Sequence, residues 1–556
     1  MYKEMYEEWL ASAYYDEATK EELRAIAGDE KEIEDRFFKT LEFGTGGMRG
    51  VIGAGINRIN KYIIRKATQG FANYIKQTQK DTYSIVIAYD SRYKSDEFAK
   101  EAALVMAANG IKAYTFTELR TTPELSFSVR ELNADGGIMI TASHNPPEYN
   151  GYKVYGDDGC QLVPHLADQL VASVEAITDF NTILAMTEEE ATAKGLFQWI
   201  DQDLDKKYID MVKTMSRKPD LFAKYPEYKV VYSPLHGTGG MAVTRTMDEL
   251  GFKGLIPVTE QMVPDHNFTT VPSPNPEDVK AFDVSMGYAK DNDAELIIAT
   301  DPDCDRVGLV VKNSDGDYVP LNGNQTGALL LDYVLASYDT LPKNPIVIST
   351  IVTSGLGRAV AEYYGVEHQE TLTGFKFIGE KIKQFEDGSK TFLFGYEESY
   401  GYLAGTHVRD KDAVIASMLV IEMALYYRDK DMTILEGLED IYKRLGYYKE
   451  DLHAMTLKGK EGMAEIQRII KGFRTDTLTE IGGKKVARVM DCLEPEKTGL
   501  PESNVLKYIM EDGSWVAVRP SGTEPKLKFY FSAKADSAKS VDEGLAALKQ
   551  GILDRL

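Results

Sequence analysis

The sequence has few cysteines: only three occur among its 556 residues. Cys160, Cys304 and Cys492 lie far apart, so they form neither a CxxC metal knuckle nor an even-numbered disulfide framework. Free thiols persist in reducing compartments, whereas small secreted proteins rely on paired cysteines. We therefore expect a cytoplasmic protein.

Long apolar runs and a basic leader are also missing. The most apolar stretch, Ala413 to Tyr427, is too short to span a bilayer and contains Glu422. The N-terminus is acidic and has neither the basic start nor the apolar core of a signal peptide. These absences predict a soluble protein with no membrane partner.

Positive charge is scarce relative to negative charge. Lys and Arg number 64, Asp and Glu number 87, and the formal net charge is −23. A chain this acidic is repelled by nucleic acid and by anionic membranes, so neither is expected as a partner. Any phosphate that it binds must be met by a local cationic pocket. The 43% hydrophobic and 27% charged residues are ordinary for a globular protein and exclude a disordered chain.

Strand and helix patterns alternate along most of the chain. After a charged, helix-prone start, the glycine-rich stretch Phe43 to Gly50 is not expected to form a regular element. Apolar strand patterns then alternate with helical ones from Tyr83, and this rhythm restarts at Tyr228 and at Asn344. Such alternation is typical of βαβ units, so we expect three α/β domains with mixed, mainly parallel sheets. Beyond about residue 440, closely spaced strands predict a smaller α+β domain.

The length also indicates several domains, since one domain usually holds about 100 to 200 residues. The pentapeptide Gly-Thr-Gly-Gly-Met occurs at 44–48 and again at 237–241. Five residues are short, so internal duplication and chance stay equally open. The expected segments are a helical arm over 1–40, three α/β domains over 41–205, 206–320 and 321–440, and a C-terminal lid domain over 441–556.

A first polar loop, Thr141 to Tyr155, follows an apolar strand. In open α/β sheets ligands bind beyond the carboxyl ends of strands, which places Ser143 and His144 where chemistry is usually done. Asn145 and the two prolines after it prevent immediate helix formation. An Asn-Pro turn with an incidental serine is the alternative. A serine hydrolase is disfavoured, because Gly-x-Ser-x-Gly is absent around Ser143.

A second polar loop carries three aspartates after another apolar strand. Asp301, Asp303 and Asp305 alternate, so in an extended, curved loop their carboxylates can point to one side and require a cation. Oxygen-only ligands indicate Mg²⁺ or Ca²⁺ rather than zinc. An EF-hand is excluded, because its sixth position would be Arg306 instead of glycine. A solvated acidic turn is the alternative.

The third loop offers Glu397, Glu398 and Ser399 after a further apolar strand. Carboxylate and hydroxyl groups side by side suit hydrogen bonding to vicinal sugar hydroxyls, although a polar turn would contain the same residues. Downstream, the charged segment His407 to Asp412 indicates a helix start or a solvated turn equally well.

The fourth loop joins two predicted strands and carries the sequence Arg-Pro-Ser-Gly-Thr at 519–523. Arg519 can hold a phosphate bidentately, Ser521 and Thr523 add hydroxyl donors, and Gly522 lets backbone amides approach closely. The four loops together supply a serine, a divalent-metal site, a sugar-hydroxyl reader and a phosphate clamp, one in each predicted domain.

These loops resemble those of the α-D-phosphohexomutase superfamily and, within it, the phosphoglucomutases. The resemblance covers nearly the whole chain from Phe43 onward, in the family's order, and rests on four motifs. They read Thr-Ala-Ser-His-Asn-Pro, Asp-Pro-Asp-Cys-Asp-Arg, Gly-Tyr-Glu-Glu-Ser and Arg-Pro-Ser-Gly-Thr. The resemblance implies three similar α/β domains and a smaller fourth around a central cleft.

The resemblance also implies roles for particular residues. Ser143 corresponds to the family's phosphoserine and would also face the metal. Asp301, Asp303 and Asp305 correspond to the ligands of one Mg²⁺, with Arg306 beside the moving phosphoryl group. Lys153, His407 and Lys411 are candidates for the general acid and base. The implied substrate-binding residues are Arg49, His144, Lys376, Glu397, Ser399, Arg519, Ser521, Gly522 and Thr523.

The implied reaction interconverts glucose 1-phosphate and glucose 6-phosphate. The phosphoryl group passes from the serine to the sugar, giving glucose 1,6-bisphosphate, which also serves as activator and must turn over before it returns its other phosphoryl group. The family makes a monomer or weak homodimer our expectation.

Two positions depart from the family's usual pattern, and a third differs from the members that act on mannose phosphates. Pro302 and Tyr400 stand where glycine is common, as in a branch that includes bacterial α-phosphoglucomutases, phosphopentomutase-type enzymes and glucose-1,6-bisphosphate synthases. Gly401 stands where members acting on mannose phosphates commonly have histidine. The alternatives are a phosphopentomutase, a phosphomannomutase, a phosphatase and a non-catalytic sugar-phosphate sensor.

Overall fold

The computed structural model describes residues 2–43, 47–457, 459–476, 478–521 and 526–556. The chain divides into two compact units. The first unit comprises Met1–Leu321, Ile378–Glu386 and Gly401–Leu425. The second unit comprises Asn322–Phe377, Asp387–Tyr400 and Tyr426–Leu556.

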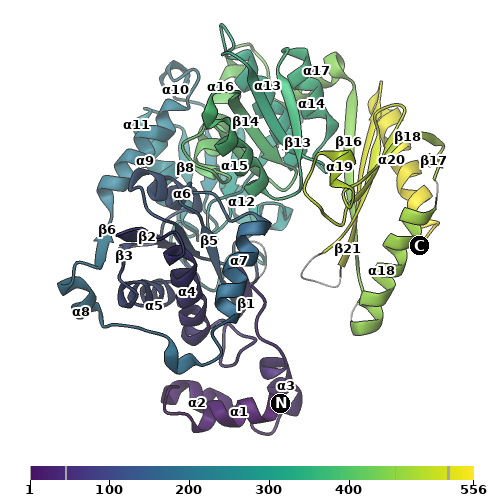
Figure 1. The fold of residues 1–556 in the computed structure, drawn as a ribbon. Coiled ribbons are helices and arrows are strands. Elements are labelled where there is room, and N and C mark those ends of the chain that lie inside the picture. Colours follow the sequence, from purple (N-terminus) through teal and green to yellow (C-terminus); the bar gives the residue numbers. More distant parts are fainter. Residues whose placement is uncertain (1, 44–46, 458, 477, 522–525) are drawn as a thin grey trace. The chain divides into compact units, whose positions relative to one another are not determined.

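The helix-prone N-terminus forms three short helices (Figure 1). The side chains of Asp16 and Asp29 accept hydrogen bonds from first-turn amides of the second and third helices, which satisfies donors that a helix leaves free at its start. Trp9 stacks on Tyr15 with ring centroids 4.0 Å apart, within an aromatic cluster that holds this arm together. The helices are α1 (Tyr2–Ala11), α2 (Glu17–Ala25) and α3 (Glu30–Phe37).

A six-stranded sheet follows, with the order β1-β5-β4-β2-β3-β6. Strands β2, β3, β4 and β6 are parallel, whereas β5 is antiparallel to β1 and β4. Ile85 and Ile87 of β2 belong to the core beneath α4 and α5, and Val86 belongs to the core beneath α6, so this strand is buried on both faces. The strands are β1 (Met48–Val51), β2 (Tyr83–Tyr89), β3 (Ile111–Phe116), β4 (Gly137–Ile140), β5 (Tyr149–Tyr155) and β6 (Phe197–Ile200). The helices are α4 (Lys61–Lys76), α5 (Ser95–Ala108), α6 (Thr122–Glu131), α7 (Pro164–Glu175), η1 (Phe180–Thr182) and α8 (Glu188–Ala193).

The prediction that the glycine-rich stretch forms no regular element is wrong. Its last residues, Met48 to Gly50, lie in β1 and pair with β5. Gly151 of β5 permits this close approach, because a Cβ there would lie 2.5 Å from the carbonyl oxygens of Met48 and Thr141. The absence of a side chain therefore supports strand pairing at this point.

The second sheet has five strands in the order β11-β10-β9-β7-β8, and its first three members form an antiparallel meander. Residues 313–317 form a hairpin turn within this meander: the Asn313 amide donates to the carbonyl of Asp317 at 2.8 Å, and Gly316 takes a positive φ of 89°. The strands are β7 (Val230–Ser233), β8 (Leu255–Pro257), β9 (Leu296–Thr300), β10 (Val307–Lys312) and β11 (Tyr318–Leu321). The helices are α9 (Gln202–Thr214), α10 (Asp220–Lys224), α11 (Gly239–Glu249), η2 (Val279–Phe282) and α12 (Asp283–Asn292).

The second unit contains a parallel sheet in which β12 lies between β13 and β14. Its C-terminal part is a six-stranded antiparallel sheet with the order β16-β21-β20-β19-β18-β17, packed against α18 and α20, which confirms the predicted change to α+β structure. The parallel part includes β12 (Pro345–Thr350), β13 (Glu367–Thr371), β14 (Thr391–Glu397), α13 (Gly323–Ala336), α14 (Gly355–Tyr363) and α17 (Ile434–Leu445). The C-terminal strands are β16 (Tyr447–Thr456), β17 (Glu480–Ile481), β18 (Lys484–Asp491), β19 (Leu506–Met510), β20 (Trp515–Pro520) and β21 (Lys526–Ala535), with helices α18 (Gly459–Thr475), α19 (Pro495–Thr498) and α20 (Ala538–Leu553).

The remaining elements are α15 (Phe375–Gln384), η3 (Phe385–Asp387), β15 (Gly401–Ala404) and α16 (Ala413–Arg428). Helix α16 contains the most apolar stretch of the sequence. Neither this helix nor any other in the described part of the chain has the length and apolarity that a membrane crossing requires.

Candidate active site

Ser143 lies in the turn after β4, at the carboxyl edge of the first sheet, as the sequence predicts. The residue is 1% exposed and takes a left-handed backbone conformation with φ of 53°. Its amide donates to Thr141 Oγ1 at 2.8 Å. Its hydroxyl donates to Asp301 Oδ2 at 2.9 Å and lies 3.1 Å from His144 Nδ1. The serine and aspartate loops, far apart in sequence, therefore meet at this hydroxyl.

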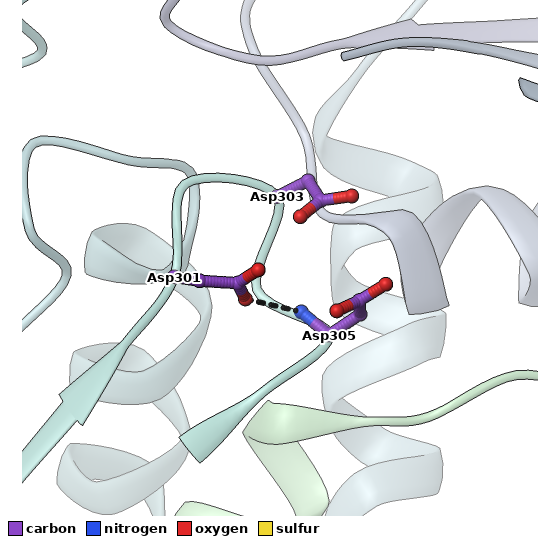
Figure 2. A group of neighbouring side chains, drawn as sticks. All are labelled: Asp301, Asp303 and Asp305. Carbon is purple, nitrogen blue, oxygen red and sulfur yellow. Dashed lines mark hydrogen bonds between the residues drawn. The ribbon is translucent and has the colours of Figure 1, made fainter. Parts of the chain in front are cut away.

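The three aspartates converge in the loop between β9 and β10 (Figure 2). All three are buried, and one carboxylate oxygen from each lies within 4.8 Å of the others. Asp301 Oδ1 accepts the amides of Asp305 at 3.0 Å and Arg306 at 2.9 Å, which closes the loop on itself. The alternative of a solvated acidic turn is excluded, because these carboxylates are shielded from water.

Buried carboxylate oxygens without a partner indicate room for a hard cation. Among the described residues, Asp303 Oδ1 and Asp305 Oδ1 have no hydrogen-bond partner. Burial, together with the charges of Asp303 and Asp305, raises the pKa of Asp301 well above its ordinary value. A divalent cation would give these oxygens a partner and would stabilise the ionised form of Asp301. The triad therefore fits a metal held by oxygen ligands alone.

Two lysines neutralise part of this charge. Lys153, on β5, places Nζ 2.5 Å from Asp303 Oδ2 and 3.2 Å from Asp305 Oδ2. Lys411 Nζ lies 3.2 Å from Asp305 Oδ2 and 2.9 Å from Asp410 Oδ1. Burial opposes ionisation of Asp305, but the ammonium groups of Lys411 and Lys153 outweigh it and lower the pKa of this carboxyl. The site therefore holds a dense mixture of buried opposite charges.

The third acid or base candidate, His407, lies elsewhere in the first unit. Its imidazole is exposed, and its pKa is lowered by partial desolvation and by the charges of Arg130 and Arg409. Among the described residues, no hydrogen bond or ion pair joins His407 to the aspartate loop. The structure thus brings Lys153 and Lys411 to the three aspartates and leaves His407 apart.

Cationic and imidazole groups also surround Ser143. Arg49 Nη1 donates to Asn145 Oδ1 at 3.3 Å, in the serine loop. Arg306 forms an ion pair with Glu277. Burial and the charges of Arg306 and Arg49 lower the pKa of His144 well below its ordinary value. Within this acidic protein, two arginine charges therefore act on the imidazole next to Ser143.

The predicted sugar-reading residues lie in the second unit. Glu397 ends β14, is buried, and accepts the amide of Gly374 at 2.8 Å through Oε1. This bond fixes the Thr-Gly-Phe-Lys turn, which carries the buried Lys376, to the end of β14. Ser399 follows in the next turn and is half-buried.

The predicted phosphate loop begins at the end of β20. The Ser521 amide donates to the carbonyl of Lys526 at 2.7 Å, while Gly522 and Thr523 lie outside the described residues. Burial and then the charge of Glu398 raise the pKa of Tyr530 to about 12, and Arg519 opposes that rise. Glu398 and Arg519 therefore act on one phenol, which makes the sugar and phosphate loops neighbours within the second unit.

Three further residues at the site were not predicted individually from the sequence, although one of them, Asp410, lies within the charged segment His407 to Asp412. Thr122 begins α6 and binds Asp303 twice: its amide donates to the backbone carbonyl at 2.9 Å and its hydroxyl to Oδ2 at 3.0 Å. Asp410 accepts the hydroxyl of Tyr155 at 2.9 Å while it holds Lys411. Arg92 donates a hydrogen bond to the backbone carbonyl of Ser143. For Arg92 a usable signal exists, since Asp-Ser-Arg follows β2 at the same sheet edge as Ser143.

Comparison with known proteins covers nearly the whole chain. Four family profiles match in order: phosphoglucomutase/phosphomannomutase alpha/beta/alpha domain I over residues 40–180, domain II over 206–316, domain III over 322–445, and the C-terminal domain over 456–548. A phosphoglucomutase of Staphylococcus epidermidis is 40% identical over 510 residues, covering 89% of this chain and 91% of that protein. One of Staphylococcus aureus is 39% identical over 533 residues, covering 93% and 94%.

Solved structures show the same fold at lower identity. Parafusin, a phosphoglucomutase from Paramecium in an open form, superposes with a TM-score of 0.71 at 18% identity and covers 93% of this chain and 94% of that one. A phosphoglucomutase/phosphomannomutase family protein from Burkholderia thailandensis gives a TM-score of 0.67 at 19% identity, covering 92% and 96%. The matches over all four domains and the identity to the staphylococcal enzymes show that the chain belongs to the phosphoglucomutase/phosphomannomutase family of α-D-phosphohexomutases, isomerases that transfer a phosphoryl group within a sugar phosphate.

Proposed function

We propose that this chain is a phosphoglucomutase that interconverts glucose 1-phosphate and glucose 6-phosphate. The observation that carries the proposal is the hydrogen bond from Ser143 to Asp301, which sets a buried hydroxyl against a cluster of three buried carboxylates that could hold a metal ion. The names of the staphylococcal relatives support glucose as the sugar. In this reaction Ser143 carries the phosphoryl group and glucose 1,6-bisphosphate is the intermediate and activator.

The proposed metal is a single Mg²⁺ held by Asp301, Asp303 and Asp305, with the phosphorylated Ser143 as a further ligand. The unpartnered oxygens of Asp303 and Asp305 support this assignment. When bound, the ion would neutralise charge on the phosphoryl group as it moves. Thr122 and the amides of Asp305 and Arg306 hold the carboxylates in place for it.

The chain's own cations have a separate task in this scheme. Phosphoryl transfer depends on positioning and on charge neutralisation more than on covalent chemistry. Arg49, Arg306 and Lys153 lie around Ser143 and offset the negative charge of the phosphoryl group and its leaving oxygen. The attacking sugar hydroxyl must also lose a proton, and the placement of Lys153 and Lys411 at the metal site favours them over His407 for that role.

Substrate selection is assigned to the second unit. Glu397, Ser399 and Lys376 read the sugar, and Arg519, Ser521, Gly522 and Thr523 hold the phosphate that is not being transferred. Because the bisphosphate must react at both ends, these loops must accept two orientations of one ligand. We also infer a reducing, cytoplasmic setting, which the three buried free thiols support.

A substrate panel tests the proposal. Glucose, mannose, N-acetylglucosamine and ribose 1-phosphates are assayed with Mg²⁺ and a trace of the matching bisphosphate. We expect the highest kcat/KM for glucose 1-phosphate. A higher value for mannose or ribose phosphate would move the assignment to a phosphomannomutase or phosphopentomutase, and no turnover of any sugar phosphate would favour a sensor.

A further inference from the structure

The guanidinium of Arg92 donates hydrogen bonds to the backbone of the loop that carries Ser143. Arg92 follows β2, and its side chain is fully buried. Its Nη1 donates to the carbonyl oxygens of Pro146 at 2.8 Å and Tyr149 at 3.1 Å. Its Nη2 donates to the carbonyl oxygens of Ser143 and Asn145, both at 2.5 Å. Four carbonyls of a single loop thus converge on one side chain.

The amide side of Ser143 is tied to the same turn. Asp90 Oδ2 lies 3.4 Å from Arg92 Nε and accepts the hydroxyl of Thr141 at 2.6 Å. Thr141 Oγ1 in turn accepts the amide of Ser143 at 2.8 Å. Asp90 Oδ1 is held by Ser95 Oγ at 2.8 Å. Both the amide and the carbonyl of Ser143 are therefore bound, directly or through one hydroxyl, to the pair Asp90 and Arg92.

These hydrogen bonds hold Ser143 in a backbone conformation that is unfavourable for a residue with a side chain. Ser143 has a φ of 53°, a conformation that residues with a side chain adopt only when their surroundings impose it. Without the guanidinium, the four carbonyls would lose their shared donor and the turn would relax. The hydroxyl would then leave its place 2.9 Å from Asp301.

We propose that Arg92 is a positioning residue for phosphoryl transfer, which fixes the Ser143 loop in the strained turn that presents the hydroxyl to the metal site. This inference rests on the proposed function. Arg92 does not touch the hydroxyl or the phosphoryl group; it acts through the backbone of residues 143–149. Its effect falls on the geometry of transfer, and misplacement of a reacting group by about 1 Å can cost about a hundredfold in rate.

The chemistry of the side chain explains why arginine stands here. A guanidinium presents two Nη groups in a fixed planar fork, so each can serve a separate pair of carbonyls. A lysine ammonium is a point charge with three donors and cannot span the four acceptors. The flat face adds a second contact, since the Phe268 ring centroid lies 5.0 Å from the Arg92 guanidinium carbon. Phe268 belongs to the predicted segment 206–320, which also carries the aspartate loop. Arg92 therefore contacts both the loop that carries Ser143 and the segment that carries the three aspartates.

Two variants and a control test the role. Arg92→Lys keeps the charge and most of the volume, and Arg92→Met removes the charge. Arg120→Lys is the control: Arg120 is also buried in the first unit but pairs with Asp205, at 2.8 and 3.0 Å, and binds no atom of the Ser143 loop among the described residues. For Arg92→Lys we expect kcat to fall at least tenfold while KM for glucose 1-phosphate changes less than about threefold, because the proposed sugar-binding groups of the second unit are untouched. Arg120→Lys should keep kcat within about threefold.

Hydrogen exchange supplies a readout that does not depend on turnover. In Arg92→Lys the peptide covering residues 141–153 should exchange faster than in the wild type, and in Arg120→Lys it should not. If Arg92→Met fails to fold, Arg92→Lys decides. A folded Arg92→Lys protein with wild-type kcat, or with unchanged exchange in this peptide, overturns the inference. A wild type that turns over no sugar phosphate would contradict the proposed function instead.

Discussion

The hydroxyl of Ser143 donates to Asp301 across 2.9 Å, although the two residues are 158 positions apart in the sequence. Ser143 follows β4 of the first sheet, and Asp301 follows β9 of the second. Ligands bind at the carboxyl ends of strands in open α/β sheets, and here two such ends are brought together. The contact joins the proposed phosphoryl carrier to the proposed metal.

Asp303→Asn should separate catalysis from folding. The amide keeps the shape and can still accept from Thr122, Lys153 keeps Asp305 as partner, and repulsion within the triad falls, so the melting temperature should change little. Loss of one ligand charge should lower kcat by about 10² to 10³-fold, the range found when one preorganised transition-state group is removed. Magnesium titrations of the rate and thermal unfolding check this. Full activity of the variant in the presence of a chelator would refute the metal assignment.

Thr122→Val tests whether the start of α6 supports the metal loop. The substitution keeps the volume and removes the hydroxyl that donates to Asp303 Oδ2. Outer-sphere substitutions of this kind typically cost about 10 to 100-fold in metal affinity, so the Mg²⁺ concentration for half-maximal rate should rise about tenfold with KM for the sugar unchanged. Thr246→Val is the control: it removes a buried hydroxyl of α11 whose one hydrogen bond within the described part of the chain goes to the Ala242 carbonyl. Equal Mg²⁺ requirements in both variants would contradict the role.

Glu397→Gln tests sugar recognition. The amide oxygen of glutamine can still accept from Gly374, so the loop should keep its shape while its charge is lost. Hydrogen bonds to charged groups contribute about 1.5 to 3 kcal/mol, and kcat/KM for glucose 1-phosphate should therefore fall about ten- to a hundredfold with weaker discrimination against mannose 1-phosphate. Glu367→Gln, an exposed glutamate of β13 paired with Lys390, is the matched control. The prediction fails if the two variants have the same kinetics.

Glu450 predicts a pH dependence of stability. It lies between the hydroxyls of Ser354 and Ser532, at 2.5 and 3.1 Å, and burial raises its pKa to about 7 from an ordinary 4.5. The folded state then holds a proton that the unfolded state has released, so stability falls as pH rises from 4.5 to 7, by at most about 1.4 kcal/mol per pH unit. Glu450→Gln cannot release this proton, and its stability relative to the wild type should increase over that window and level off above pH 7. Denaturant unfolding between pH 5 and 8 measures the difference, and parallel curves would exclude the raised pKa.

The sequence predicted the parts of the site that lie in short motifs. The serine turn and the alternating aspartates could be found because each combines an apolar strand with an unusual cluster of polar residues. Thr122 and Asp410 could not, since their roles arise from contacts with Asp303 and with Lys411 and Tyr155 that no spacing encodes.

Two features of the fold also could not be predicted from the sequence pattern. Strand β16 was not predicted, because Tyr448 is its only fully buried residue and its side chains leave no apolar period of two. Lys411 falls in the predicted segment 321–440 yet belongs to the first unit, where it meets Asp305. The two units are built from separate stretches of the chain, whereas the predicted domains are consecutive segments, so the predicted boundaries stay a prediction.

The central claim is that Ser143 carries the phosphoryl group. The most direct measurement is peptide mass spectrometry of the protein after incubation with glucose 1,6-bisphosphate and Mg²⁺, with Ser143→Ala and His144→Gln as comparisons. We expect one added phosphoryl group on the peptide spanning Thr141 to Lys153 in the wild type and in His144→Gln, and neither label nor mutase turnover in Ser143→Ala. Turnover retained in Ser143→Ala, or a label lost in His144→Gln and kept in Ser143→Ala, would contradict the account.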